Sequence, residues 1–405
     1  MKTTFWQKAR FLVLLLLVVL ITISSHPVIV DVSRSAGLES GTILSRYIIM
    51  VFAGLFLMCL NMKSMFKPKL IKTCWLIYAF LVIWYLITFA TLESNAMMSD
   101  VRSIGICLVA IMIGWQLDLD ERRFKTLLIA FAGMTLFVGL MQIMTNIGGF
   151  QILDQYQTDN KNSLGVMLSS CATVFFFMGI NKERAGFVKM LWLALFILSL
   201  IVLLTIRARA ATLATAMIVL YILYERYKGR NFVFYFIIGI FLIAAVIVLM
   251  PSVFKEYIFN SFVQHQEGDI TSGRMERNSI AFQFLSEHFI LGNLDQNVSM
   301  GQVHNYLLNR TVEFGFLFVI PILLLYMQLL IRTIVKTIKA NNHDTQTIGF
   351  FLLLIPFIIS MAEPTFPFGP GTATLFNFIV FGLSLRYADN KKYETPSNIQ
   401  LRSAL

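Results

Sequence analysis

Long apolar runs of the length that crosses a bilayer recur along the whole sequence. Residues 11–30, for example, contain no Lys, Arg, Asp or Glu. A helix of roughly 20 apolar residues crosses the hydrocarbon core of a membrane once. The sequence therefore predicts an all-α polytopic integral membrane protein with about twelve transmembrane helices. The expected spans are residues 11–30, 43–62, 75–92, 101–117, 126–145, 164–180, 187–206, 210–224, 232–250, 311–331, 347–362 and 372–386.

The composition supports this class, with 57% hydrophobic residues, 14% charged residues and a mean hydropathy of +0.74. A soluble domain carries about 25% charged and about 45–50% apolar residues. These values exclude a soluble enzyme, a disordered chain and a secreted disulfide scaffold. Four cysteines lie in or at the ends of apolar runs without Cys-x-x-Cys spacing, so we expect them to be buried thiols. They are Cys59, Cys74, Cys107 and Cys171.

The apolar stretch from Phe187 to Glu225 is too long to be a single span. Its 39 residues, 187–225, would form a helix of about 58 Å, roughly twice the thickness of the hydrocarbon core. Beyond its first turn, only Arg207 and Arg209 interrupt it. The sequence therefore predicts two spans that meet at a tight turn around these arginines.

Basic residues are distributed unevenly between the two sides that these spans define. Of the 33 Lys and Arg residues, 23 fall on the side shared with the N-terminus. Such an excess marks the cytoplasmic side, so both termini are predicted to be cytoplasmic. The net charge of +11 is then explained by topology, and we expect no nucleic-acid partner. The first span is too long for a cleaved signal peptide and is expected to be retained.

One connection is much longer than the others. Residues 251–310 separate the ninth and tenth spans on the external side, and loops of this length usually carry function. The chain thus divides into spans one to nine (1–250), the external loop (251–310), and spans ten to twelve with a cytoplasmic tail (311–405). Residues 274–291 of the loop predict an amphipathic helix at the outer surface, because their apolar positions have helical spacing. These positions are Ile280, Phe284, His288 and Leu291.

Two pairs of arginines on the predicted outer side are candidate anion-binding groups. Arg207 and Arg209, at the hairpin, either extend to lipid phosphates or bind a diphosphate substrate through their planar guanidinium groups. Arg274 and Arg277 are three residues apart and would share one face of the loop helix. The alternative for the second pair is an ordinary solvated helix start, capped by the hydroxyl residue before it.

A histidine precedes the tenth span. His304 is followed by Asn305, and an imidazole can transfer protons near neutral pH. Glu313 could orient this imidazole or act as a second base, and Lys161 at the start of the sixth span could line the same cavity. The other histidines lack partners at metal-ligand spacing, and the sequence has no P-loop, dinucleotide fingerprint or zinc-protease motif. No metal and no cofactor are therefore expected.

In their order along the chain, these residues resemble the motifs of the O-antigen ligase and polymerase superfamily of bacterial envelope glycosyltransferases. The similarity covers roughly residues 160–330, and twelve spans extend it in outline to the whole chain. Ala210 stands where glycine is common in the family, and Phe318 replaces a second glycine. The matching segments are Arg209-Ala210-Ala211-Thr212-Leu213 for the Arg-x-x-x-Leu turn, Ser272-Gly273-Arg274 and Leu291-Gly292-Asn293 for the outer loop, and His304-Asn305 followed by Gly315.

The resemblance implies a metal-independent glycosyltransferase of the bacterial cytoplasmic membrane whose active site faces the periplasm. The donor would be a glycan on undecaprenyl diphosphate. The acceptor would be a second lipid-linked repeat unit for a polymerase of O-antigen, capsule or exopolysaccharide, or lipid A core for an O-antigen ligase. A chain-length regulator is a further candidate partner, beside the membrane lipids.

The resemblance also assigns roles to the candidate residues. Arg209 and Arg274, together with Arg207, would stabilise the departing diphosphate, and His304 would accept the proton of the attacking hydroxyl. Arg277, Asn305 and Lys161 would bind the diphosphate or the glycan, and Glu313 would assist the base. A lipid-linked sugar transporter or flippase is the alternative from another class. The lack of charged residues near the middle of the well-defined spans favours an outward-facing active site instead.

Overall fold

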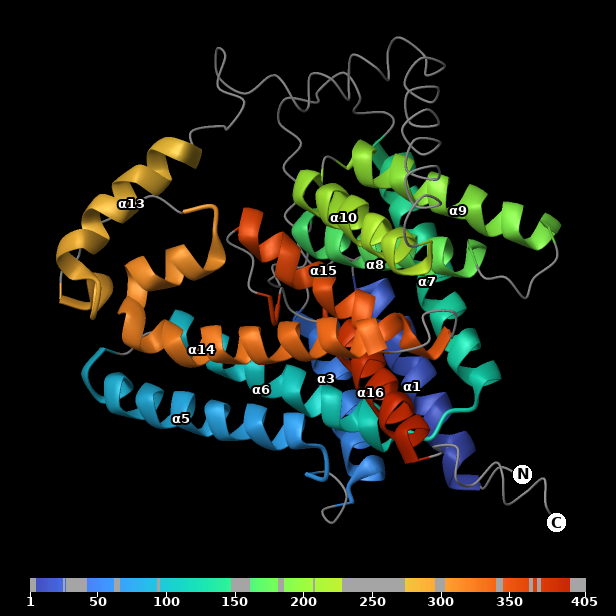
Figure 1. The fold of residues 1–405 in the computed structure, drawn as a ribbon, viewed down its shortest axis with the longest axis horizontal. Coiled ribbons are helices and arrows are strands. Elements are labelled where there is room, and N and C mark those ends of the chain that lie inside the picture. The colour runs from blue at the N-terminus through green and yellow to red at the C-terminus, as the bar shows by residue number, and fades with distance from the viewer. Residues whose placement is uncertain are drawn as a thin grey trace, which may run out of the picture.

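The computed structural model describes residues 5–24, 26, 42–61, 66–92, 95–146, 161–180, 186–206, 208–227, 274–295, 303–339, 345–363, 367–369 and 373–393. Every regular element in these segments is helical, which confirms the all-α class for the described part of the chain (Figure 1). The α-helices are α1 (Phe5–Ile23), α3 (Thr42–Cys59), α5 (Lys69–Leu92), α6 (Asn95–Gln116), α7 (Glu121–Asn146), α8 (Lys161–Gly179), α9 (Gly186–Thr205), α10 (Arg209–Arg226), α13 (Arg274–His288), α14 (Tyr306–Lys339), α15 (Ile348–Ala362) and α16 (Leu375–Tyr393). Two short 3-10 helices are η2 (Gly292–Asp295) and η3 (Thr345–Thr347).

Eight of the described helical segments are long and apolar enough to cross a membrane. They contain α1, α5, α6, α7, α8, α9, α14 and α15, and they make the chain a helical membrane protein. Helices α3, α10 and α16 coincide with three more of the expected spans. The ninth expected span, 232–250, lies outside the described residues, so the count of twelve stays a prediction.

Several helix ends differ from the limits of the apolar runs. Helix α1 begins at Phe5 and ends at Ile23, whereas the apolar run covers 11–30, and α14 begins five residues before the expected 311. The reason is that hydropathy locates the apolar centre of a span, while capping and tertiary contacts determine where its helix begins and ends.

The predicted division of residues 187–225 is confirmed. Helix α9 ends at Thr205 and α10 begins at Arg209. The α9–α10 turn lies against the start of α8, because a Cβ added at Gly165 would be 3.1 Å from the Cβ of Ala208. At the other end, Arg226 Nη1 donates to the carbonyl oxygen of Ile180, 2.6 Å away. Helices α8 and α10 are therefore parallel neighbours, and α9, which connects them in the chain, runs in the opposite direction.

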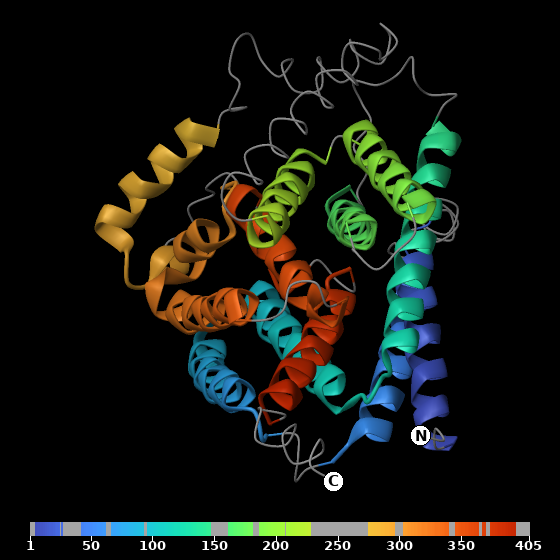
Figure 2. The same cartoon turned by 45° about the vertical axis from the view of Figure 1, so that its right-hand side comes forward.

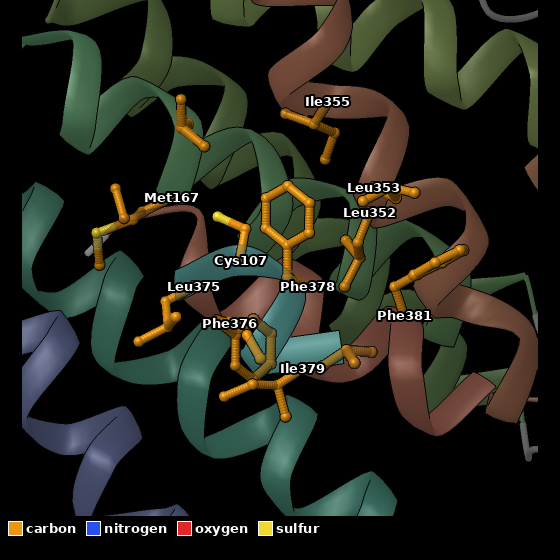
Figure 3. Close-up of a cluster of buried hydrophobic side chains, with 14 of the residues drawn as sticks. Cys107, Met167, Leu352, Leu353, Ile355, Leu375, Phe376, Phe378, Ile379 and Phe381 are labelled. Carbon is orange, nitrogen blue, oxygen red and sulfur yellow. The ribbon is translucent and has the colours of Figure 1, made fainter. Parts of the chain in front are cut away.

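The core of the bundle lies where α6, α8, α15 and α16 meet. Figure 3 shows Cys107, Met167, Leu352 and Phe378 from these four helices gathered in it. Helices α6 and α16 approach closely, because a Cβ added at Gly114 would lie only 2.0 Å from the carbonyl oxygen of Ile379. Small residues at a crossing permit such backbone contact in membrane proteins. All four cysteines are buried free thiols, as the sequence predicts.

Contacts at the two ends of the bundle agree with alternating spans. The beginnings of α6 and α14 and the end of α15 are joined at one end, as described below. At the opposite end of α6, Arg386 of α16 donates to the carbonyl oxygen of Trp115, 3.2 Å away, and lies 3.5 Å from Asp118. Gln7 of α1 also donates to Asp118, at 3.5 Å. Three of the helix ends predicted to share the cytoplasmic side, those of α1, α6 and α16, thus lie together, and the side itself stays a prediction.

Candidate functional site

Asn305 holds the beginning of α14 against the end of α15. Its side-chain oxygen accepts a hydrogen bond from the backbone N–H of Leu308 at 3.0 Å, which satisfies a free N–H of the first turn. Its amide nitrogen donates to the carbonyl oxygen of Met361 at 3.2 Å, in the last turn of α15. Both ends of the amide therefore bond within the protein. Asn305 caps the N-terminus of α14 and joins it to the last turn of α15.

His304 lies between an arginine and a carboxylate from two other elements. Its Nε2 is 3.2 Å from Nη1 of Arg277, on α13. Its Nδ1 is 3.7 Å from Oε2 of Glu363, the first residue after α15. The imidazole is 24% exposed and the Glu363 side chain is 17% exposed, so the pair is partly open to solvent. The loop helix, the beginning of α14 and the end of α15 thus converge on this imidazole.

Two glycines anchor α13 to α14. Gly292 and Gly315 have φ angles of +63° and +75°, in the region that favours glycine. A Cβ added at Gly292 would lie 2.4 Å from the backbone nitrogen of Gly315, so the two backbones are in direct contact. At the kink, the backbone N–H of Phe316 donates to the carbonyl oxygen of Phe289, 2.9 Å away, instead of continuing the helix. This junction sets where α13 carries Arg277.

Figures 1 and 2 both show α13 at the edge of the bundle, beside the beginning of α14. A helix within residues 274–291 is therefore confirmed, and its position at the outer surface of the membrane stays a prediction. Ile280 and Leu291 are 51% and 42% exposed, and the helix ends at His288. The buried face is Ala281 and Leu285, which pack with Val303 and Val312. Residues 280 and 284 form one line along the helix surface, and residues 281 and 285 form the adjacent line. Which of the two lines is buried depends on where α14 lies.

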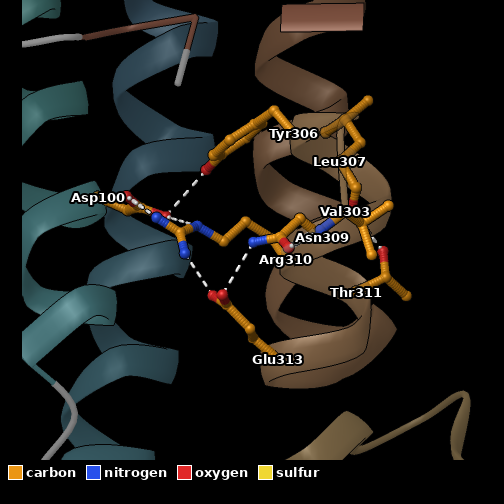
Figure 4. Close-up of polar contacts among 8 residues, drawn as sticks. All are labelled: Asp100, Val303, Tyr306, Leu307, Asn309, Arg310, Thr311 and Glu313. Carbon is orange, nitrogen blue, oxygen red and sulfur yellow. Dashed lines mark hydrogen bonds and ion pairs between the residues drawn. The ribbon is translucent and has the colours of Figure 1, made fainter. Parts of the chain in front are cut away.

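A buried ion-pair network lies in the first turns of α14, which follow His304 in the chain, and Figure 4 shows its side chains. Arg310 binds Asp100 of α6 with two nitrogens, Nε at 2.6 Å and Nη2 at 3.0 Å. Tyr306 donates its hydroxyl to the same carboxylate at 3.0 Å. Glu313 accepts hydrogen bonds from Arg310 and from Asn309. The side chain of Asp100 is only 4% exposed. The network therefore locks the beginning of α14 to α6.

The sequence does not mark Asp100 as a site residue, and it makes Glu363, at the outer end of the eleventh expected span, only a weaker candidate, either a proton acceptor or an ordinary helix terminus. Asp100 precedes an apolar run in the sequence, and the helix around it begins five residues earlier. The sequence predicts that Glu313 orients the imidazole or acts as a second base. Its contacts are with Asn309 and Arg310, and the carboxylate that faces His304 is Glu363. The sequence does contain one indication of the ion-pair network. Tyr306 and Arg310 are four residues apart, so on a helix their side chains share one face.

The remaining candidates are placed only in part. Arg209 is the first residue of α10, at the α9–α10 turn, and is half-buried. Arg207 lies outside the described residues. Arg274 and Lys161 begin α13 and α8, and their side chains lie outside the described part. Convergence of Arg207, Arg209 and Arg274 on His304 therefore stays a prediction.

The pair of His304 and Glu363 offers two protein groups that could exchange a proton with a bound hydroxyl, and Arg277 offers a cation beside them. Among the described residues, no three His, Cys, Asp or Glu side chains are grouped closely enough to hold a metal ion. No protein-family model matches the sequence, and no curated protein matches it significantly.

Proposed function

We propose that the protein is a glycosyltransferase that polymerises oligosaccharide repeat units carried on undecaprenyl diphosphate into a surface polysaccharide, such as O-antigen, capsule or exopolysaccharide. The observation that carries this proposal is the contact between Arg277 of the loop helix and His304 at the beginning of α14. An anion-binding group and a proton acceptor are thus side by side at one end of an apolar bundle, where a lipid-linked anionic substrate could reach them. The order of the resembling motifs supports the same proposal.

The reaction needs one nucleophile, one proton acceptor and a stabilised leaving group. A hydroxyl of the acceptor glycan attacks the anomeric carbon of the donor, and the bond from that carbon to the diphosphate oxygen breaks. The hydroxyl proton passes to Nε2 of His304, and undecaprenyl diphosphate departs. Arg277, joined by Arg209, Arg274 and Arg207, stabilises the negative charge on the diphosphate, because preorganised cations in a site of low dielectric contribute most to such reactions. Lys161 is proposed to line the same cavity.

The distribution of charge along the described helices supports an enzyme over a transporter. On α14, no Asp, Glu, Lys, Arg or His lies between Glu313 and Arg332, and on α6 none follows Arg102. A path for an anionic sugar through both leaflets would need polar groups along these segments. The charged residues of α6 and of the first turns of α14 gather at the end next to His304.

The test is incubation of the purified protein, in lipid nanodiscs with a metal chelator, with an undecaprenyl-diphosphate oligosaccharide. A ladder of products is expected, and His304→Ala should abolish it. His26→Ala, at a histidine outside the site, should leave the ladder unchanged. Transfer that appears only when lipid A core is added would make the protein a ligase. Absence of any product from the folded wild-type protein would contradict the proposal.

A further inference from the structure

We propose that Glu363 is the positioning residue of His304: its carboxylate holds the proton of Nδ1, so that Nε2 is the atom that accepts the proton of the attacking hydroxyl. For its catalytic meaning this inference rests on the proposed function. The arrangement of the two side chains can be measured without any substrate.

The contact with Arg277 identifies the tautomer. A guanidinium group has only N–H donors, so a nitrogen that it approaches at 3.2 Å must act as the acceptor. Nε2 of His304 is therefore unprotonated, and the single proton of the neutral ring is on Nδ1. That nitrogen faces Oε2 of Glu363 at 3.7 Å. Catalytic hydrogen bonds are often long without substrate and shorten in the complex.

The backbone keeps the two side chains in register. The hydrogen bond from Asn305 to the carbonyl oxygen of Met361 joins the residue after His304 to the residue two positions before Glu363. Glu363 itself donates its backbone N–H to the carbonyl oxygen of Ile359 at 3.0 Å and then leaves the helix with extended dihedral angles. His304 thus precedes α14 and Glu363 follows α15, and a hydrogen bond joins these two helix ends.

The pair has a consequence for the reaction. When Nε2 takes the hydroxyl proton, the ring becomes a cation whose Nδ1–H points at the Glu363 carboxylate, which stabilises that cation and keeps the ring orientation. Before the donor binds, the guanidinium group of Arg277 donates a hydrogen bond to Nε2 of His304. The diphosphate is a stronger partner for a guanidinium than an imidazole is, so donor binding draws Arg277 away and exposes Nε2 to the hydroxyl.

Charged groups face the imidazole from each neighbouring element. Arg277 approaches from α13 and Glu363 from the end of α15. Arg310 and Glu313 of the first turns of α14 form the ion-pair network with Asp100 of α6. Removal of the Glu363 charge takes away a negative neighbour and disfavours the imidazolium form. The acidic limb of the rate profile should then move to lower pH by about one unit.

The experiment compares wild-type protein with Glu363→Gln, Glu363→Asp and the control Glu287→Gln, an exposed carboxylate of α13. Nitrogen-15 NMR of histidine-labelled protein in nanodiscs, with the His304 signals assigned by His304→Ala, should show the Nδ1–H tautomer. Glu363→Gln should weaken this preference, and Glu287→Gln should not. Wild-type His304 protonated at Nε2, or a tautomer unchanged in Glu363→Gln, overturns the inference.

Kinetics then test the catalytic meaning. Glu363→Gln should lower kcat by about 100-fold with little change in KM, within the range expected for an impaired general base. Glu363→Asp should recover part of the rate. A folded Glu363→Gln protein, verified by an unchanged melting temperature, that keeps its kcat and its pH profile contradicts the inference. Because the NMR readout needs no substrate, it separates failure of the pair from failure of the proposed function.

Discussion

The ion pair between Arg310 and Asp100 lies where an unpaired charge is costly. Both residues are inside helices of an apolar bundle, and Arg310 binds the carboxylate with two nitrogens. Removal of one partner from a buried pair leaves an uncompensated charge, whereas removal of both leaves only a packing change. The pair was not predictable from the sequence. Asp100 and Arg310 each stand near an apolar run, and nothing in a single sequence indicates that these two runs are neighbours.

Arg310→Leu should lower the free energy of unfolding by about 3–5 kcal/mol, because Asp100 loses its cation and Glu313 remains nearby. The double variant Asp100→Leu/Arg310→Leu should lose less than half as much. Denaturant unfolding in detergent micelles measures both values. A double variant as unstable as the single one would show that the network does not act as a charge-compensated pair.

At the scale of elements, the junction of α13 and α14 explains two residues that the sequence marks only by resemblance. Gly292 and Gly315 were matched to family motifs, and the structure shows them in backbone contact, both with positive φ. The loop helix was predictable from the helical spacing of its apolar residues. The α9–α10 hairpin was predictable because its apolar stretch is too long for one span. The buried face of α13 was not, because adjacent rows of apolar residues can only be distinguished once the partner helix is in place.

Gly315→Ala should destabilise the protein and reduce glycan transfer. A side chain at its positive φ costs about 1–3 kcal/mol, and the added Cβ would lie 2.2 Å from the carbonyl oxygen of Ile290. The matched control is Gly133→Ala, within α7, where a Cβ meets no atom within 4 Å. The control should be neutral or slightly stabilising, because alanine favours a helix more than glycine does.

Melting temperatures of both glycine variants in nanodiscs provide the measurement. Equal melting temperatures for Gly315→Ala and Gly133→Ala would mean that the kink and its contact with the loop do not stabilise the fold.

At the scale of the whole molecule, hydropathy and the charge distribution predicted a helical membrane protein, and eight membrane-length helices bear this out. The elements expected on one side also lie together, as Gln7, Asp118 and Arg386 show. The candidate site was predictable only in part. The residue types of His304 and Arg277 indicate a site, and the two side chains converge. The contact of Glu363 with His304 depends on the packing of α15 on α14, which no local pattern encodes.

Arg209→Ala and Arg274→Ala should each abolish polymer formation while leaving membrane insertion intact, because the proposed mechanism needs both cations at the leaving diphosphate. Arg46→Ala, an exposed arginine of α3 outside the motifs, is the control and should keep normal polymer. Gel analysis of the product ladder reads the result. Long polymer in normal amount from either of the first two variants would remove that arginine from the mechanism.

The central claim is that the end of the bundle carrying Arg277 and His304 faces outward and binds a lipid diphosphate. Its most direct test is the labelling of Glu276→Cys, at the exposed position of α13 next to Arg277, by a membrane-impermeant maleimide in intact cells, since the four native cysteines are buried. Arg122→Cys, at the exposed beginning of α7 on the predicted cytoplasmic side, is the control. We predict that Glu276→Cys is labelled from outside and protected by added undecaprenyl diphosphate, and that Arg122→Cys is labelled only after permeabilisation. Labelling of Glu276→Cys only in permeabilised cells, or at a rate that the lipid diphosphate does not change, would contradict the claim.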